Sequence, residues 1–306
     1  MKKINASFYE PNFNGNFDEI PISRQALTVN GNLNNINFTI NDYNADWHIL
    51  GTWISNIEEL IGKKIIYLQQ EPPEIKMPSK TILDNCNVAL TFFNIDHPIP
   101  QILAPPALQW TYDISAELIK GKGHVYKKVN NDYLTDMLFY EVPKKYKKCS
   151  IILSSKQMIE GHKKRIYFAD ALKSRFKDEI DVFGFGYNPI QNKKDAIAPY
   201  YYSIALENKK MENWWTEKIA DVFLGHTCPI YYGCSNIENF FDPASFVNID
   251  IDNLDEAIEI TGKAIENLNI INMGNIIEAR RAILLDFNML SLISLAINRY
   301  ENNLIK

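Results

Sequence analysis

The sequence predicts an α/β protein with two domains, each built around a mainly parallel sheet. Its 306 residues suffice for two hydrophobic cores, since a domain of roughly 150 residues buries enough surface to fold by itself. Short apolar segments alternate with amphipathic ones, and a repeated order of strand and helix is typical of parallel sheets. Hydrophobic residues make up 46% and charged residues 23%, a composition that excludes disorder. We expect domains at residues 1–148 and 149–274, followed by helices at 275–306 that pack across both.

The first domain contains two segments with the pattern of buried strands. Residues 64–68 and 88–93 are short apolar runs with polar residues at their ends, as in the central strands of a parallel sheet. Pro72 and Pro73 interrupt the chain between them, which predicts a loop. Ahead of the first strand, residues 53–61 carry apolar side chains at the spacing of a short helix.

The second domain repeats this alternation. Residues 161–176 have the pattern of a basic amphipathic helix, and apolar residues recur near helical spacing from Asn275 onward. A helix lying on a membrane surface is the alternative for the C-terminal segment. Such helices carry many basic residues, whereas the polar face here offers Arg280, Arg281 and Arg299, so packing into the core is favoured. The expected strands are 149–155, 181–186, 202–208, 228–233 and 245–249.

Charge and cysteine usage limit the classes of partner and compartment. The net charge of -5 argues against a nucleic-acid-binding surface. The short basic cluster of Lys144, Lys145, Lys147 and Lys148 either attracts anionic lipid or lies in a solvated interdomain loop, and the loop is favoured. No unbroken apolar run is long enough to span a bilayer, so we expect at most peripheral membrane contact. The sequence has neither a Cys-x-x-Cys pair nor the apolar core of a signal peptide. A cytoplasmic protein is therefore expected, and peripheral attachment to the inner face of the membrane is the alternative.

One stretch of the second domain combines the residue types that bind a phosphorylated ligand. Glu207 and Asn208 follow an expected strand, and open α/β sheets bind ligands at the carboxyl ends of their strands. Thr216 then begins a helix with Glu217 and Lys218 in its first turn. A helix N-terminus with a lysine suits a diphosphate, and the Glu217 carboxylate suits sugar or ribose hydroxyls. The alternative is that Thr216 merely caps a solvated helix.

The order and spacing of three motifs in this stretch resemble the alpha-1,3-fucosyltransferase family. Residues 206–208, 214–218 and 229–233 stand where that family has Phe-Glu-Asn, Tyr-Val-Thr-Glu-Lys and a Pro-hydrophobic-Tyr-Gly turn. The resemblance extends from residue 151 to 249 and is faint in the N-terminal half. It implies two facing Rossmann-like domains of the GT-B type. It also implies inverting transfer of L-fucose from GDP-fucose to a hydroxyl of an acceptor glycan, namely O3 of GlcNAc or glucose, as in lipopolysaccharide.

The resemblance also implies roles for single residues of the second domain. Lys218 is expected to contact the donor diphosphate, Glu217 and Asn208 to lie in the nucleotide-sugar site, and Glu207 to support it. Arg165 matches a family helix whose arginine meets the diphosphate, which a guanidinium binds in bidentate fashion; without the other motifs it would be read as a surface arginine. The predicted donor-binding set is Arg165, Glu207, Asn208, Trp214, Thr216, Glu217 and Lys218.

Two departures from the family pattern leave other functions open. Trp214 and Trp215 stand where the family has Tyr and Val, and Lys209 stands where it has Ser. Each tryptophan either stacks on a base or sugar or packs in the core. A transferase that uses another nucleotide sugar is therefore one alternative, and a non-catalytic protein that binds a nucleotide sugar or glycan is the second.

The base that an inverting transfer requires is sought among the carboxylates of the first domain. Glu71, which precedes two prolines, resembles the catalytic glutamate of the family. Glu74 is its rival, and Asp84 and Asp113 are weaker candidates.

Metal is not expected to be required. Asp250 and Asp252 form an Asp-x-Asp spelling, but it lies beyond the family motifs and such pairs are common by chance. Arg165 and Lys218 are able to neutralise a diphosphate themselves. The five histidines show no spacing typical of metal ligands, so no metal or other cofactor is predicted.

Overall fold

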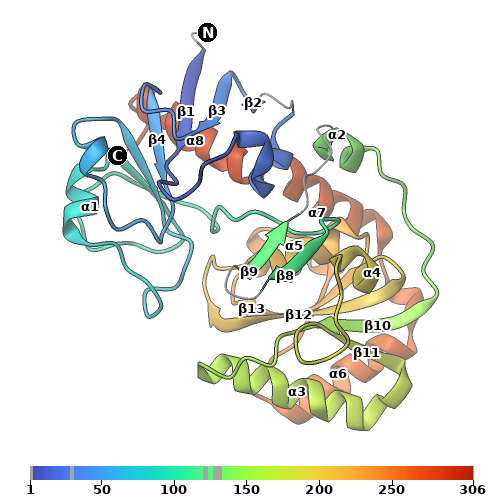
Figure 1. The fold of residues 1–306 in the computed structure, drawn as a ribbon. Helices are drawn as coiled ribbons and strands as arrows, with labels where there is room; N and C mark the ends of the chain where they lie inside the picture. Colours follow the sequence, from blue (N-terminus) through green and yellow to red (C-terminus); the bar gives the residue numbers. More distant parts are fainter. Residues whose placement is uncertain (1–2, 28–30, 120–122, 127–132, 306) are drawn as a thin grey trace. The chain divides into compact units, whose positions relative to one another are not determined.

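A computed structural model of the chain describes its fold (Figure 1). The described residues are 3–27, 31–119, 123–126 and 133–305.

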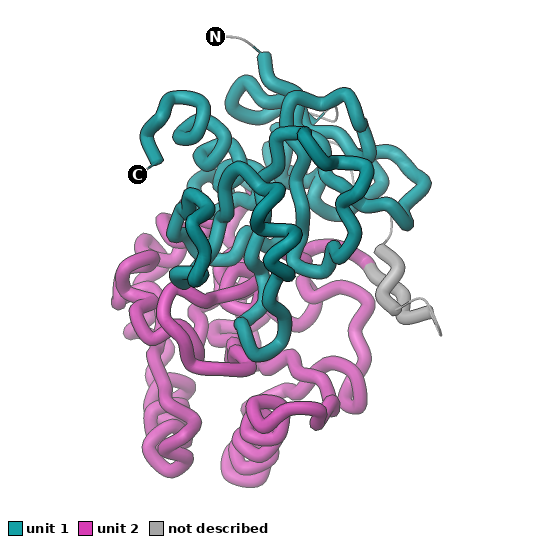
Figure 2. The backbone as a smooth tube through the Cα atoms, turned by 90° about the vertical axis from the view of Figure 1, so that its left-hand side faces the viewer, with its two compact units in different colours: residues 1–109, 128–139, 284–306 teal, residues 110–127, 140–283 magenta. Residues whose placement is uncertain are grey.

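The chain divides into two compact units, coloured separately in Figure 2. Unit 1 comprises residues 1–109, 128–139 and 284–306, and unit 2 comprises residues 110–127 and 140–283. This division differs from the expected one, because the chain passes between the units more than once before its second half. Contacts that are distant in sequence assign residues near 110 to unit 2 and the C-terminal helix to unit 1.

Unit 1 contains a seven-stranded sheet with the order β2-β3-β1-β4-β5-β6-β7. All neighbouring strands pair in parallel except β2 and β3. The two strands predicted in this half are confirmed as β5 and β6, whose residues are all buried. The strands are β1 Ile4–Phe8, β2 Asn32–Leu33, β3 Ile36–Ile40, β4 Trp47–Leu50, β5 Ile65–Leu68, β6 Val88–Thr91 and β7 Gln101–Leu103.

The helix predicted at residues 53–61 is wrong. The structure has only a three-residue 3-10 helix there, η3 Glu58–Leu60. The reason is that two of the apolar residues that made the pattern, Trp53 and Ile61, are 62% and 61% exposed. Of the predicted segment, Ile57 and Leu60 are buried in the core of unit 1.

The C-terminal segment forms two helices, α7 Met273–Leu285 and α8 Met289–Glu301. Asn288 separates them, and its side chain accepts hydrogen bonds from the backbone N–H groups of Leu290 and Ser291, which caps α8. Helix α8 packs on the sheet of unit 1, while α7 lies in unit 2 up to residue 283. Within the described residues no single helix has the length and apolar composition to span a membrane, and α7 with α8 meets that test only as a bent pair.

Unit 2 contains a five-stranded, wholly parallel sheet with the order β11-β10-β12-β13-β14. Helices α3 and α6 lie on one face of it, and α4 and α5 lie on the other (Figure 1). The predicted strands and the helix at 161–176 are confirmed as these elements. Their bounds are β10 Lys147–Ile152, α3 Glu160–Phe176, β11 Ile180–Phe183, α4 Lys193–Ile197, β12 Tyr200–Met211, α5 Glu217–Leu224, β13 Cys228–Cys234, β14 Val247–Asn248 and α6 Leu254–Glu266.

Short elements complete the described chain. Strands β8 and β9 form an antiparallel pair. The remaining bounds are β8 Ala116–Ile119, β9 Gly123–Tyr126, α1 Lys80–Asn85, α2 Tyr133–Leu138, η1 Phe17–Glu19, η2 Pro21–Gln25, η4 Lys177–Glu179, η5 Ile237–Asn239, η6 Pro243–Ser245 and η7 Leu268–Ile270. One mainly parallel and one wholly parallel sheet, both with helices packed on them, confirm the predicted α/β class.

Of the four lysines expected in a solvated loop, Lys144 is exposed, Lys145 is bound by groups of unit 2, and Lys147 and Lys148 lie in β10. Lys145 Nζ donates to the carbonyl oxygens of Ala198 and Gly225, both at 2.8 Å, and to Thr227 Oγ1 at 2.7 Å. Its ammonium group therefore binds the C-terminal ends of α4 and α5, where a helix dipole favours a cation. The other paired lysines are Lys147, which binds Asp181, and Lys148, which binds Glu179.

Candidate active site

The strand order of unit 2 indicates where a ligand binds. In the sheet, β10 has β11 on one side and β12 on the other, so the order reverses between β10 and β12. In open α/β sheets, ligands bind at this switch point, outside the carboxyl ends of the strands. The predicted residues Glu207 and Asn208 lie on β12 beyond its last pair with β10, and Arg165 lies on α3, the helix that follows β10.

A glycine brings α3 close to β12 at this point. A Cβ atom at Gly161 would lie 1.7 Å from the carbonyl oxygen of Asn208, so no other residue fits without moving the backbone. The first turn of α3 and the end of β12 are therefore in direct contact.

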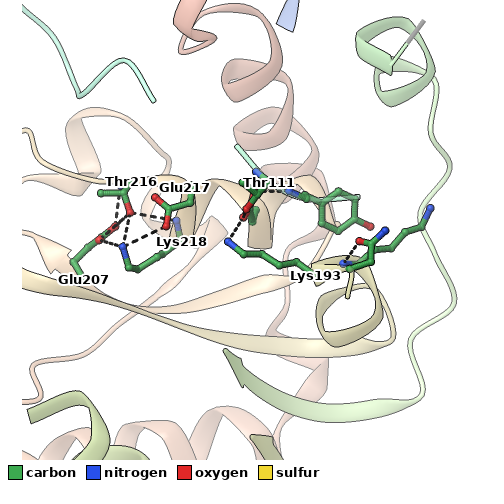
Figure 3. A network of polar contacts seen from close by, with 10 residues as sticks. Thr111, Lys193, Glu207, Thr216, Glu217 and Lys218 are labelled. Carbon is green, nitrogen blue, oxygen red and sulfur yellow. Dashed lines mark hydrogen bonds and ion pairs between the residues drawn. The ribbon is translucent and has the colours of Figure 1, made fainter. Parts of the chain in front are cut away.

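Glu207 is the centre of a buried hydrogen-bond network (Figure 3). Its side chain is fully buried, and its Oε1 accepts hydrogen bonds from the backbone N–H and the Oγ1 of Thr216, both at 2.8 Å. Its Oε2 accepts from Lys218 Nζ at 3.1 Å. Because Glu207 is enclosed, its effect on a ligand acts through the two residues that it holds in place.

Thr216 is the N-cap of α5, as predicted. It has extended backbone angles, its Oγ1 accepts from the backbone N–H of Lys218 at 3.3 Å, and the helix begins at Glu217. Thr216 Oγ1 also lies 3.0 Å from Lys218 Nζ. The same hydroxyl thus fixes both the helix end and the lysine of its first turn.

The charges at the start of α5 are tightly coupled. Lys218 Nζ lies 3.5 Å from Glu217 Oε1 as well as 3.1 Å from Glu207 Oε2. Although burial opposes ionisation, Lys218 and Lys193 lower the pKa of Glu217 to about 2, and Glu207 and Glu217 raise the pKa of Lys218 above its ordinary value. Glu217 and Lys218 are consequently both charged at neutral pH.

Arg165 lies beside this network, and its side chain is only 7% exposed. Its Nη1 donates to the carbonyl oxygen of Leu206 at 3.2 Å, next to Glu207 in the chain. Within the part of the chain that the structure describes, Arg165 Nε is buried without a hydrogen-bond partner. The structure therefore brings Arg165, Glu207, Thr216 and Lys218 together in unit 2, as the sequence analysis expected.

A second network on α5, also drawn in Figure 3, was not predicted from the sequence. Asp221, 1% exposed, accepts from the backbone N–H groups of Thr111 and Tyr112, from Thr111 Oγ1, and from Lys193 Nζ at 2.6 Å. It attaches residues 111–112 to α5 one turn after Lys218. The separation in sequence between Thr111 and Asp221 left no local signal for it.

The tryptophans that depart from the family pattern are buried. Trp214 and Trp215 are 2% and 4% exposed, and Trp215 packs edge-on against Phe240 and Phe241. This burial favours the packing role over stacking on a ligand, and the donor contact assigned to Trp214 stays a prediction.

Glu71 lies in unit 1, in the loop that follows β5. The side chain of Gln69 fixes this loop by donating to the carbonyl oxygens of Glu71 at 2.5 Å and Lys76 at 2.9 Å. Glu71 is half-buried and its rival Glu74 is exposed. The loop predicted from the two prolines is confirmed, and the role of Glu71 stays a prediction.

Both aspartates of the Asp-x-Asp motif form ion pairs with lysines. Asp250 Oδ2 lies 2.8 Å from Lys210 Nζ, and Asp252 Oδ1 lies 2.5 Å from Lys164 Nζ. Tyr232 also donates its hydroxyl to Asp252. The carboxylates of both residues are thus engaged by protein groups.

Comparison with known proteins identifies the domain that holds this site. Residues 142–261 match the family model described as glycosyltransferase family 10 (fucosyltransferase), C-terminal part. The alpha-(1,3)-fucosyltransferase FucT of Helicobacter pylori is 41% identical over 75 residues. That match covers 24% of this chain and 16% of the length of the relative.

Solved structures share the fold. A crystal structure of an alpha1,3-fucosyltransferase is 20% identical with a TM-score of 0.54, over 92% of this chain and 90% of the other. A structure of alpha1,3-fucosyltransferase with GDP-fucose is 19% identical with a TM-score of 0.50, over the same shares. A glycosyltransferase from Rickettsia africae is 11% identical with a TM-score of 0.51, over 99% of both chains. Residues 142–261 are therefore similar in sequence to the C-terminal part of glycosyltransferase family 10 (fucosyltransferase), and the chain shares its fold with the solved alpha1,3-fucosyltransferase.

Proposed function

We propose that this protein is an inverting glycosyltransferase that moves L-fucose from GDP-fucose to a hydroxyl of an acceptor glycan. The segment that matches family 10 contains all the residues predicted to bind the donor. A protein of the same fold has been solved with GDP and with GDP-fucose. We also propose the GT-B arrangement that the sequence predicts. In it, the second half of the chain binds the donor and the first half binds the acceptor.

The observation that carries the proposal is the cationic pair at the switch point of unit 2. Lys218 stands at the N-terminus of α5, where backbone N–H groups and the helix dipole also favour an anion. Arg165 is buried beside it with an N–H group that has no partner among the described residues. A guanidinium, an ammonium and a helix N-terminus together suit the leaving diphosphate of a nucleotide sugar.

Glu71 is proposed as the base. It would accept the proton of the acceptor hydroxyl while that oxygen bonds to C1 of fucose and the bond from C1 to the diphosphate oxygen breaks, so that GDP leaves with the electron pair. Attack from the face opposite the leaving group inverts the anomeric carbon. Glu74 is the matched comparison residue, because it lies in the same loop.

A divalent metal is proposed to be dispensable. Arg165 and Lys218 supply positive charge for the diphosphate, and both aspartates of the Asp-x-Asp spelling are engaged by lysines. The proposed acceptor is O3 of GlcNAc or glucose in a glycan such as lipopolysaccharide. The proposed location is the cytoplasm, with peripheral attachment to the inner face of the membrane as the alternative.

Calorimetric titration with GDP, UDP and CMP, each with and without EDTA, tests the donor assignment. We expect selective binding of GDP that EDTA does not change. Lys218→Met should weaken it by about 2 kcal/mol, since a hydrogen bond to a charged group contributes about 1.5–3 kcal/mol. Lys210→Met, which removes an exposed lysine of the same unit, is the control and should bind as the wild type does. Preference for UDP or CMP would favour the alternative transferase, and GDP binding without turnover would favour a non-catalytic protein.

A further inference from the structure

His162 lies near the proposed diphosphate site and is not one of the residues predicted to bind the donor. It lies in the first turn of α3, three residues before Arg165, and residues at this spacing share one face of a helix. Its ring atom Nδ1 is buried and has no hydrogen-bond partner among the residues that the structure describes.

Helix α3 and strand β12, which touch at Gly161, both carry buried polar atoms without a hydrogen-bond partner among the described residues. Besides His162 Nδ1, they are Arg165 Nε on α3 and Asn208 Oδ1 on β12, each buried without a partner within the described ranges. Gly161 permits the close approach of these two elements, because a Cβ there would clash with the Asn208 carbonyl oxygen. Buried polar groups nearly always have partners, so three unpaired polar atoms on two elements in contact favour a polar ligand near them.

The charged side chains around the site include two cations and two carboxyl groups, so a bound diphosphate would be stabilised by a further cation. Arg165 and Lys218 already face two carboxylates, Glu207 and Glu217. These carboxylates offset part of the positive charge of Arg165 and Lys218. A nucleotide diphosphate adds at least two negative charges, so a further cation at the site would strengthen its binding.

His162 is able to supply that charge. Burial lowers its pKa, and so do the neighbouring cations Arg165, Lys156 and Lys218, so the imidazole is neutral at neutral pH in the free protein. A bound diphosphate reverses the sign of the local field and favours the imidazolium form. The protonated ring then donates an N–H to a phosphate oxygen.

We propose that His162 is a third diphosphate-binding residue, which takes up a proton when the nucleotide sugar binds. This inference rests on the proposed function, since it assigns a further residue to the same donor site. Its consequence is that donor affinity increases as the pH falls.

Proton-linked calorimetry tests the proposal. GDP-fucose is the ligand, because its diphosphate, esterified at both ends, does not titrate near neutrality. Binding is measured at pH 6 and pH 8 in buffers of different ionisation enthalpy. For the wild type we expect net proton uptake and binding that is about threefold to sixfold tighter at pH 6 than at pH 8, since a pKa rise of one unit on binding sets a limit of about tenfold.

Two variants separate His162 from its surroundings. His162→Gln should bind about threefold to sixfold more weakly than the wild type at pH 6, lose most of that difference at pH 8, and take up no proton. Glu207, whose pKa burial raises, is unchanged in this variant, so proton uptake that persists at the wild-type level would come from a group other than His162 and would contradict the proposal. Lys163→Gln, an exposed neighbour on the same helix, should retain the wild-type pH dependence. Equal melting temperatures of the three proteins establish that the variants are folded.

The outcomes distinguish this proposal from the donor assignment. If His162→Gln matches the wild type in affinity and proton uptake at both pH values, His162 is not a diphosphate residue, although the proposed function stands. If the wild type instead binds UDP-glucose, the GDP-fucose assignment fails, and the same comparison with that ligand decides the role of His162. If the wild type binds no nucleotide sugar, both proposals fail.

Discussion

At the scale of single residues, the site depends on side chains that never meet the ligand. Glu207 is fully enclosed, yet it binds the cap of α5 and the lysine proposed for the diphosphate. The residue types were visible in the sequence, because the motif order places Glu207, Thr216 and Lys218. That Glu207 acts through the other two was not, since burial depends on packing from the whole unit.

Thr216→Val tests this interpretation. The change keeps the shape of the side chain but leaves Glu207 and Lys218 without the hydroxyl that joins them. We expect a loss of about 1–3 kcal/mol in the free energy of unfolding, the cost of leaving a buried polar group unpaired, and weaker binding of GDP. Urea unfolding and calorimetry measure both effects. Thr216→Ser should retain most of the stability and affinity, and equal losses in the two variants would contradict the role of the hydroxyl.

His226 predicts how stability depends on pH. It is 3% exposed, and burial with the nearby cations Arg280 and Lys145 lowers its pKa to about 3. The unfolded chain therefore binds a proton between about pH 6.5 and 3 that the folded chain does not, so stability falls as the pH falls through this range. By pH 5 the loss should be about 2 kcal/mol.

His226→Asn provides the comparison. The residue has a φ of 52°, a conformation that asparagine tolerates, and the variant lacks the titrating ring. Its free energy of unfolding should decline less between pH 7 and pH 5 than that of the wild type. Parallel pH profiles of the two proteins would show that His226 does not cause the decline.

At the scale of elements, the second half was more predictable than the first. Five parallel strands and α3 followed from short apolar runs and helical spacing, because each segment is buried or half-buried as its pattern implies. The helix predicted at residues 53–61 does not form, and two of the apolar side chains that suggested it, Trp53 and Ile61, are exposed. In the C-terminal segment the spacing was correct, but Asn288 divides it into two helices.

Asp221 shows how α5 is anchored from outside the helix. Its carboxylate joins residues 111–112 and Lys193 to α5, one turn after Lys218. Asp221→Asn should destabilise the protein by about 3–5 kcal/mol, because it leaves a half-buried lysine without its buried partner. Guanidinium unfolding checks this value. Asp255→Asn, an exposed change in α6, should cost little, and similar losses in both would contradict the anchoring role.

At the scale of the whole molecule, the sequence predicted two sheets but placed the boundaries differently. The parallel order β11-β10-β12-β13-β14 supplies a switch point where the motif residues meet. Residues near 110 belong to unit 2 and α8 to unit 1. Local patterns do not encode such assignments, which depend on contacts like that of Thr111 with Asp221.

The central claim is fucosyl transfer from GDP-fucose, with Glu71 as the base. The most direct test measures GDP release and the anomeric configuration of the product with GDP-fucose and a GlcNAc-terminated glycan, in the presence of EDTA. We predict turnover with inversion by the wild type and by Glu74→Gln. In Glu71→Gln, kcat should fall by a factor of about 100 or more while GDP affinity is unchanged. Turnover of a different nucleotide sugar in preference to GDP-fucose, or an undiminished rate in Glu71→Gln, would contradict the account.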